Sequence, residues 1–189
     1  MAFSVPDTMK LNKPILLALD ASSSSAVHEV GYRVSSTDGK EFVFTYMQCA
    51  AVATYEGSPA VWVDTTADYV VTPDCSAGAV AAVGATGGPA GGASGFAGVF
   101  CMNNTDSNNV YLWVQTRGLV DYACVSTDVA VNDVLLISAD DCFVDAQSYA
   151  SSLTDVFILP VGHALTAAAA HGTATGDQTT HSVASIMLL

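Results

Sequence analysis

The chain has 189 residues, of which 51% are hydrophobic and only 12% charged, and its net charge is −13. A chain of this length and apolar content can bury a core without a metal or disulfide, which excludes extensive disorder. Its acidity disfavours nucleic-acid binding, because an acidic surface repels phosphate.

The first segment, residues 1–26, is expected to be an extended N-terminal arm. Pro6 and Pro14 oppose helix formation, and the serines of residues 22–25 are typical of a flexible tether. Between them, the apolar run 15–19 predicts a strand, either added to a neighbouring subunit's sheet or the first strand of the chain's own domain. The opening has no basic stretch before an apolar one, and the run is far shorter than the ~20 residues that span a bilayer. We therefore expect neither a signal peptide nor a membrane partner.

The arm also differs from the rest of the chain in charge. The first 40 residues are neutral, because four bases are balanced by four acids, whereas residues 41–189 carry one base against 14 acids. A neutral, lysine-bearing arm can lie along another acidic surface, while the acidic body is repelled by one.

Residues 27–189 are predicted to form a single all-β domain, a sandwich or barrel of short antiparallel strands. The strongest signal is Asp38-Gly39 between two alternating runs, 30–34 and 41–46, because Asp-Gly accepts the positive φ of a tight hairpin turn. Further strands are expected at residues 61–63, 69–71, 96–102, 110–116, 119–125, 134–137, 157–159 and 185–189.

A second hairpin is expected where residues 96–102 and 110–116 flank the turn-forming residues 103–109. In the second of these runs, Tyr111 and Trp113 share one face. Aromatic side chains in an alternating strand typically belong to a core or to an oligomer interface.

Three segments interrupt the predicted strands. Arg117-Gly118 is expected to end one strand before the next begins. The Gly-rich loop of residues 84–95 lacks both the following helix and the Lys-Ser/Thr of a phosphate-binding loop, so it is expected to be a surface loop. The Ala-rich residues 164–171 are expected to form no more than a short helical turn or a loop.

No residue pattern of an enzyme or cofactor site is found. The G-x-S-x-G elbow of a Ser–His–Asp hydrolase is absent, and the histidines lack metal-site spacing. The four histidines are His28, His163, His171 and His181. Calcium ligands are available from Asp140-Asp141 with Asp145, or from the 103–109 loop, although solvated turn residues are the simpler interpretation. We therefore expect no enzymatic activity, no cofactor and no resident metal.

The five cysteines are widely spaced and odd in number, which argues against a complete disulfide framework and against a zinc finger. They are Cys49, Cys75, Cys101, Cys124 and Cys142. Reduced, partly buried thiols are expected, as in proteins assembled in the cytosol.

Several segments occur in an order that is similar to that of a known family. Residues 28–34 and 38–46 are similar to its "lGtrv…dG…frY" hairpin, residues 111–118 to its "YfWlQt.G" strand, and residues 129–136 to its "l.vGdpvv" segment. Residues 159–165 are similar to its "i.VGyAL" turn, and residues 186–189 to its last apolar strand. The family is that of tailed-phage head-decoration, or capsid cement, proteins and related small virion structural proteins. Asn132-Asp133 departs from its usual Gly-Asp, and residues 84–95 are shorter than its folded insert, whose role is not carried over.

The resemblance implies a homo-oligomer, with a trimer favoured, that is made in the host cytoplasm and binds the major capsid protein on the outer surface of the virion. There it would stabilise contacts between capsid subunits. The arm residues expected to lie along the capsid are Lys10, Lys13, Ile15, Leu16, Leu17 and Leu19. Deleting residues 1–25 is then expected to leave a folded oligomer that no longer binds capsids. The alternative is a receptor- or glycan-binding module of a phage tail or fibre, which would use Tyr111, Trp113 and the exposed turns.

Overall fold

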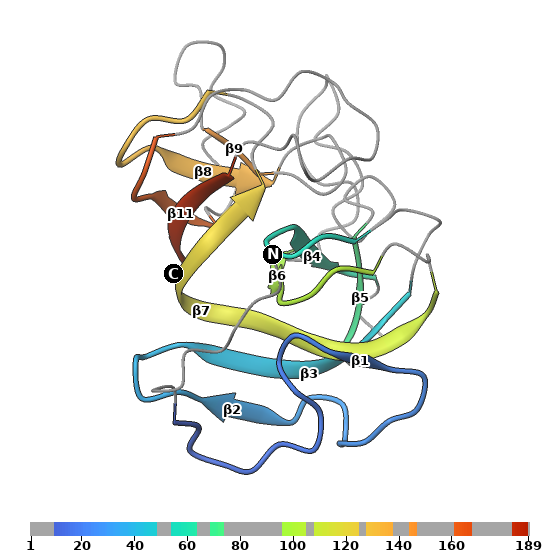
Figure 1. The fold of residues 1–189 in the computed structure, drawn as a ribbon. Coiled ribbons are helices and arrows are strands. Elements are labelled where there is room, and N and C mark those ends of the chain that lie inside the picture. Colours follow the sequence, from blue (N-terminus) through green and yellow to red (C-terminus); the bar gives the residue numbers. More distant parts are fainter. Residues whose placement is uncertain are drawn as a thin grey trace.

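The computed structural model confirms the all-β prediction (Figure 1). It describes residues 10–48, 54–63, 69–73, 96–104, 108–124, 128–137, 144–146, 161–167 and 183–188. All regular elements among these residues are strands, and they form one connected sheet whose middle closes into a small barrel.

Five strands form the barrel. In order around it they are β3 (Glu41–Met47), β5 (Val70–Thr72), β4 (Pro59–Trp62), β6 (Phe96–Phe100) and β7 (Val110–Cys124), and β7 pairs with β3 to close the ring. Each pair is antiparallel except β3 with β5, which is parallel. The pairing of β6 with β7 confirms the second predicted hairpin, and β4 and β5 confirm the strands expected at residues 61–63 and 69–71.

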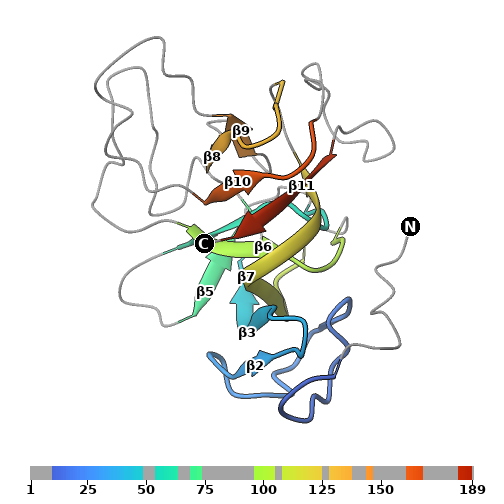
Figure 2. The same cartoon turned by 90° about the vertical axis from the view of Figure 1, so that its left-hand side faces the viewer.

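The C-terminal half of β7 leaves the barrel and joins a smaller sheet. There it pairs with β11 (Val183–Leu188), which is followed by β10 (Gly162–Ala164), β8 (Val134–Ile137) and β9 (Val144–Ala146). β8 and β11 confirm two more of the predicted strands. In Figures 1 and 2, β7 runs from the barrel to this second sheet, so a single strand connects the two parts.

The expected break at Arg117-Gly118 is wrong, because β7 continues through both residues. Gly118 has a φ of +92°, and a Cβ there would lie 3.0 Å from the carbonyl oxygen of Gly39. The register of β7 against β3 also shifts at Glu41. These residues therefore bend one strand at a bulge instead of separating two strands.

The hairpin around Asp38-Gly39 is confirmed. β2 (Arg33–Ser35) pairs antiparallel with β3, and Gly39 has the positive φ, +86°, that the turn requires. The amide of Gly39 donates to the carbonyl of Ser36 (3.1 Å), which closes the turn. β2 is shorter than the predicted run, since it begins at Arg33.

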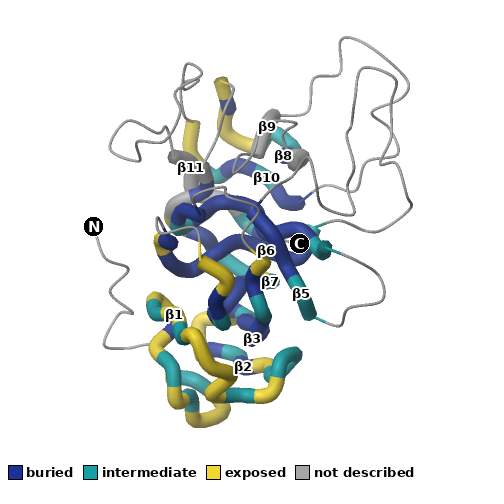
Figure 3. Tube along the Cα trace, turned by 90° about the vertical axis from the view of Figure 1, so that its right-hand side faces the viewer, coloured by how far each residue is buried: buried dark blue, intermediate teal, exposed yellow. Residues whose placement is uncertain are grey.

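β3 is buried on both of its faces, which is why it reads as a nearly continuous apolar run. Val43 and Met47 point into the barrel core, together with side chains of β4 to β7. Phe42 and Phe44 lie on the outer face, where residues 10–34 cover them. A third core cluster fills the second sheet and includes Val120 and Leu188. Figure 3 shows the buried strands in the middle and a largely exposed N-terminal segment beside β2.

The strand expected at residues 15–19 is not formed, and residues 22–25 are not simply a tether. Residues 15–19 form bends and a turn, while β1 (Ser22–Ser23) pairs with Leu112 and Tyr111 of β7. The described part of the arm, from residue 10 onward, therefore packs on the chain's own barrel.

Two predicted segments, the Gly-rich loop of residues 84–95 and the strand at 157–159, lie outside the described residues. Within the Ala-rich segment, Ala164 ends β10 and residues 165–167 contain no helix, while the remainder also lies outside them. Of the strand expected at 119–125, residues 119–124 form the second half of β7 and not a separate element.

Candidate functional site

The candidate site is the N-terminal layer, which we define as residues 10–35. It lies on the outer face of β3 and β7, at the end of the molecule away from the second sheet (Figures 1 and 2). Its own first residues protect the open edge of β2: the amide of Asn12 donates to Ser35 O (2.9 Å), and Asn12 Oδ1 accepts from the Ser35 amide (2.8 Å). This pairing reduces the tendency of an edge strand to add another chain.

The structure divides the six arm residues expected at an interface into two groups. Leu19 is only 1% exposed and belongs to the core cluster, and Ile15 and Leu17 are half-buried against the same cluster. Leu16 is 79% exposed, and Lys10 and Lys13 are also exposed. The apolar residues thus mostly attach the layer to the barrel, while three side chains remain accessible to a partner.

The two predicted aromatic residues lie beneath this layer. Trp113 is fully buried, and its Nε1–H donates to the carbonyl of Leu17 (3.0 Å). Tyr111 is half-buried and stacks on Phe44, with 6.0 Å between ring centroids. Since Trp113 is covered, it offers no open surface to a sugar ring.

His28 occupies the centre of the layer, which the sequence did not indicate. Its Nε2 accepts a hydrogen bond from the amide of Leu16 (2.9 Å), and its ring stacks on Tyr32 with centroids 4.9 Å apart. The Nζ of Lys13 lies 5.3 Å from the centroid of the Tyr32 ring. No local sequence signal predicts these contacts, because they depend on how the irregular segment folds back.

Positive charge is concentrated on the surface of this layer. Of the chain's five basic residues, Lys10, Lys13 and Arg33 are exposed there. Lys40 is 6% exposed and forms an ion pair with Asp121 (3.6 Å), and Arg117 lies 3.4 Å from Glu41. Three of the four exposed bases therefore lie in the layer, where the exposed Asp20 and Glu29 offset two of their charges, and the fourth is Arg117 at the bend of β7.

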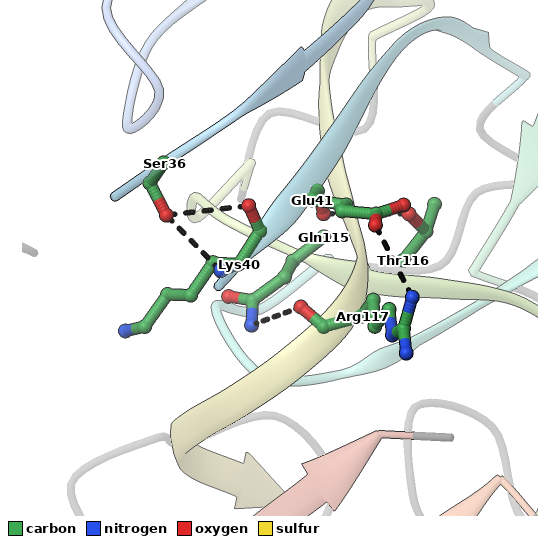
Figure 4. Close-up of polar contacts among 6 residues, drawn as sticks. All are labelled: Ser36, Lys40, Glu41, Gln115, Thr116 and Arg117. Carbon is green, nitrogen blue, oxygen red and sulfur yellow. Dashed lines mark hydrogen bonds and ion pairs between the residues drawn. The ribbon is translucent and has the colours of Figure 1, made fainter. Parts of the chain in front are cut away.

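A group of polar contacts fixes the bend of β7 beside the layer (Figure 4). Gln115 is buried, and its Nε2 donates to the carbonyls of Arg117 (3.1 Å) and Leu119 (2.9 Å) on either side of the bend. The hydroxyl of Thr116 donates to the carbonyl of Glu41 (3.3 Å). These bonds satisfy partly buried backbone carbonyls, so the simplest role for the group is structural.

A small cavity lies behind this bend, and Glu56, Cys101, Gln115 and Asp121 contribute to its lining. Burial raises the pKa of Cys101 to about 12, so its thiol stays protonated at neutral pH and is not a nucleophile. Cys101 is a free, buried cysteine, as expected; the side chains of the other four lie outside the described part of the chain.

We expect Glu56 to make stability depend on pH. Burial raises its pKa above 4.5, and the carboxylates of Asp20 and Asp121 raise it further. The folded protein then holds a proton that the unfolded chain releases, so the free energy of unfolding falls as pH rises from about 4.5 through the folded pKa. Glu56→Gln should therefore gain stability relative to the parent between pH 4 and pH 7 in urea unfolding. If the free energy of unfolding of Glu56→Gln differed from that of the parent by the same amount at pH 4 and pH 7, this role for Glu56 would be wrong.

The structure places some of the other residues that the sequence offered for a metal or a reaction. Among the described residues, no three His, Cys, Asp or Glu side chains come together as a metal site, and no helix is long and apolar enough to cross a membrane. His163 is half-buried in β10. His171, His181 and Asp140-Asp141 lie outside the described residues. Comparison with family models, with curated proteins and with solved structures finds no match.

Proposed function

We propose that this chain is a capsid-decoration, or cement, protein of a tailed phage, which binds the outside of the head and stabilises contacts between major capsid subunits. One observation carries the proposal: the segments that resemble that family are hydrogen-bonded to one another as neighbouring strands. Residues 41–46 pair with residues 111–117 through β3 and β7. Residues 134–135 pair with 162–163, and these with 187–188, through β8, β10 and β11. The similar segments thus form a large part of the hydrogen-bonded framework.

The departure at Asn132-Asp133 also supports the resemblance. Asn132 has a φ of +72°, a conformation that glycine adopts freely and that asparagine tolerates better than most residues. The Asn132 amide donates to Ala164 O (2.8 Å), and Asp133 Oδ2 accepts from the Ala130 amide (2.8 Å). Asparagine therefore accepts here a backbone conformation that favours the glycine usual at this place.

In this proposal the N-terminal layer faces the capsid. Lys10, Lys13 and Leu16 would contact an acidic, partly apolar surface of the major capsid protein, while Ile15, Leu17 and Leu19 hold the layer in place. The acidic body would project outward and keep particles mutually repelling. A homo-oligomer, with a trimer favoured, would join several capsid subunits, and a ligand that binds only the assembled shell stabilises that shell.

The alternative, a receptor- or glycan-binding module of a tail or fibre, loses its strongest feature. It relied on Tyr111 and Trp113 as an exposed aromatic platform, and Trp113 is fully buried while Tyr111 is half-buried. The described surface therefore favours decoration.

Copy number distinguishes the two functions. Densitometry of a denaturing gel of purified virions should show the chain at an abundance comparable to that of the major capsid protein. A tail or fibre module would be present at a small fraction of that abundance. Absence of the chain from virions would reject both functions.

The role of the exposed lysines can be tested by a matched pair of variants. Lys10→Gln with Lys13→Gln removes two positive charges from the layer, whereas Ala130→Glu with Val131→Glu adds two negative charges at an exposed turn beside β8. Both make the net charge more negative by two. We expect the lysine variant to bind heads about tenfold more weakly, with the difference shrinking at high salt, and the turn variant to bind like the parent. If both variants lost the same affinity for heads, the net charge of the protein, and not the lysines of the layer, would determine binding.

A further inference from the structure

We propose that Asp38-Gly39, the turn of the first hairpin, is the site at which this chain forms isoaspartate, and that Ser36 slows the reaction. Asp38 is the only Asp or Asn in the sequence that is followed by glycine. Both turn residues are exposed, and nothing lies within 4 Å of a Cβ built on Gly39. Because glycine has no side chain, a neighbouring group can approach its backbone nitrogen more closely than that of any other residue.

The reaction is an intramolecular condensation followed by hydrolysis. The backbone nitrogen of Gly39 bonds to Cγ of Asp38 and closes a cyclic imide. One carboxyl oxygen leaves as water, which takes the amide proton and a second proton from the carboxyl group or the solvent. Water then adds to either carbonyl of the imide and breaks its bond to nitrogen. Cleavage at the side-chain carbonyl restores aspartate, whereas cleavage at the main-chain carbonyl leaves isoaspartate, in which the backbone runs through Cβ and Cγ.

Hydrogen bonds of the folded turn oppose the first step at both reacting groups. The amide of Gly39 donates to the backbone carbonyl of Ser36 (3.1 Å). The hydroxyl of Ser36 donates to Oδ1 of Asp38. Lys40 O is a second acceptor for the same hydroxyl hydrogen (3.2 Å, Figure 4), but hydrogen bonds to a carboxylate are the stronger ones. Ser36 therefore restrains both the carboxyl group and the nitrogen that must meet.

Isoaspartate would disturb the contacts of this turn, because it adds a methylene group to the backbone. The tip of the hairpin packs against the bend of β7, where a Cβ on Gly118 would lie 3.0 Å from Gly39 O. The next residue, Lys40, is buried and forms the ion pair with Asp121 (3.6 Å). A longer turn displaces both contacts, so modified molecules should unfold at a lower temperature.

Warm incubation of the purified chain at neutral pH tests the proposal, with peptide mapping that separates isoaspartyl from aspartyl peptides. Isoaspartate should accumulate first at Asp38. It should form about tenfold faster in Ser36→Ala, in keeping with the loss of a hydrogen bond to a charged group. Ser36→Thr retains a hydroxyl group and should react at the rate of the parent.

Unfolding of the parent in urea gives a comparison that needs no variant to fold. The unfolded chain lacks both hydrogen bonds and should react at least as fast as folded Ser36→Ala. Equal rates in the folded and unfolded parent would overturn the protection, and isoaspartate that forms first at another residue would overturn the site. If Ser36→Thr reacted as fast as Ser36→Ala, the hydroxyl group would have no part in it. Heads are not used, so the outcome is independent of the proposed function.

Discussion

Gly98→Ala should lower the free energy of unfolding by about 3 kcal/mol or more, because two costs add. Gly98 has a φ of +143° in β6, and an added Cβ would lie 2.3 Å from the carbonyl oxygen of Gln115 and 2.6 Å from Cγ1 of Val114. The first obstacle is backbone of the neighbouring strand, so it cannot move aside without opening the barrel. Thermal unfolding should show a melting temperature lower by on the order of 10 °C.

Gly39→Ala is the matched control. Gly39 also has a positive φ, +86°, but nothing lies within 4 Å of a Cβ built there. Only the conformational cost remains, about 1–2 kcal/mol. If both variants lost equal stability, the close approach of β6 to β7 would be wrong.

Leu19→Ala should cost about 2–5 kcal/mol, the usual range for a buried leucine. Leu19 is 1% exposed and packs with Phe42, Phe44 and Trp113 on the outer face of the barrel. Leu16→Ala changes the same residue type three positions earlier, where the side chain is 79% exposed, and should alter stability by less than about 0.5 kcal/mol. Urea unfolding of the two variants measures this difference. Similar values for both would mean that the segment is a loose arm after all.

The burial of Leu19 also changes what is expected when the whole arm is deleted. The resemblance predicts that deleting residues 1–25 leaves a folded oligomer, but the deletion removes Leu19, β1 and the Leu17 carbonyl that accepts from Trp113. The outer face of β3 and β7 would be uncovered. We therefore expect the truncated chain to be destabilised, so loss of capsid binding by it would not identify a contact surface. Point variants at exposed positions are the better test.

Local turn chemistry made part of the fold predictable. Asp38-Gly39 identified the first hairpin because few sequences accept a positive φ, and alternation identified the first half of β7, while β4 and β6 were predicted as short apolar runs. The parallel pairing of β3 with β5 has no such signal, since no tight turn joins parallel strands. Arg117-Gly118 misled for a related reason: residues typical of a turn also serve a bulge inside a continuous strand.

Less of the candidate site than of the fold could be predicted from the sequence. Residues 15–19 are apolar on both faces, a pattern of a buried strand, but their backbone meets a histidine side chain and a tryptophan instead of a neighbouring strand. His28 has no metal-site spacing to the other histidines, so no residue pattern marks it as part of a site. Its hydrogen bond to Leu16 spans 12 positions and depends on an irregular backbone, which periodicity does not encode.

Cosedimentation of the purified chain with heads assembled from the major capsid protein alone tests the decoration proposal most directly. The proposal predicts saturable binding in proportion to the number of capsid subunits, together with a higher melting temperature of the decorated heads. Binding should weaken in the Lys10→Gln, Lys13→Gln variant and persist in the Ala130→Glu, Val131→Glu variant. Heads that remain bare at every concentration of the folded chain would contradict it.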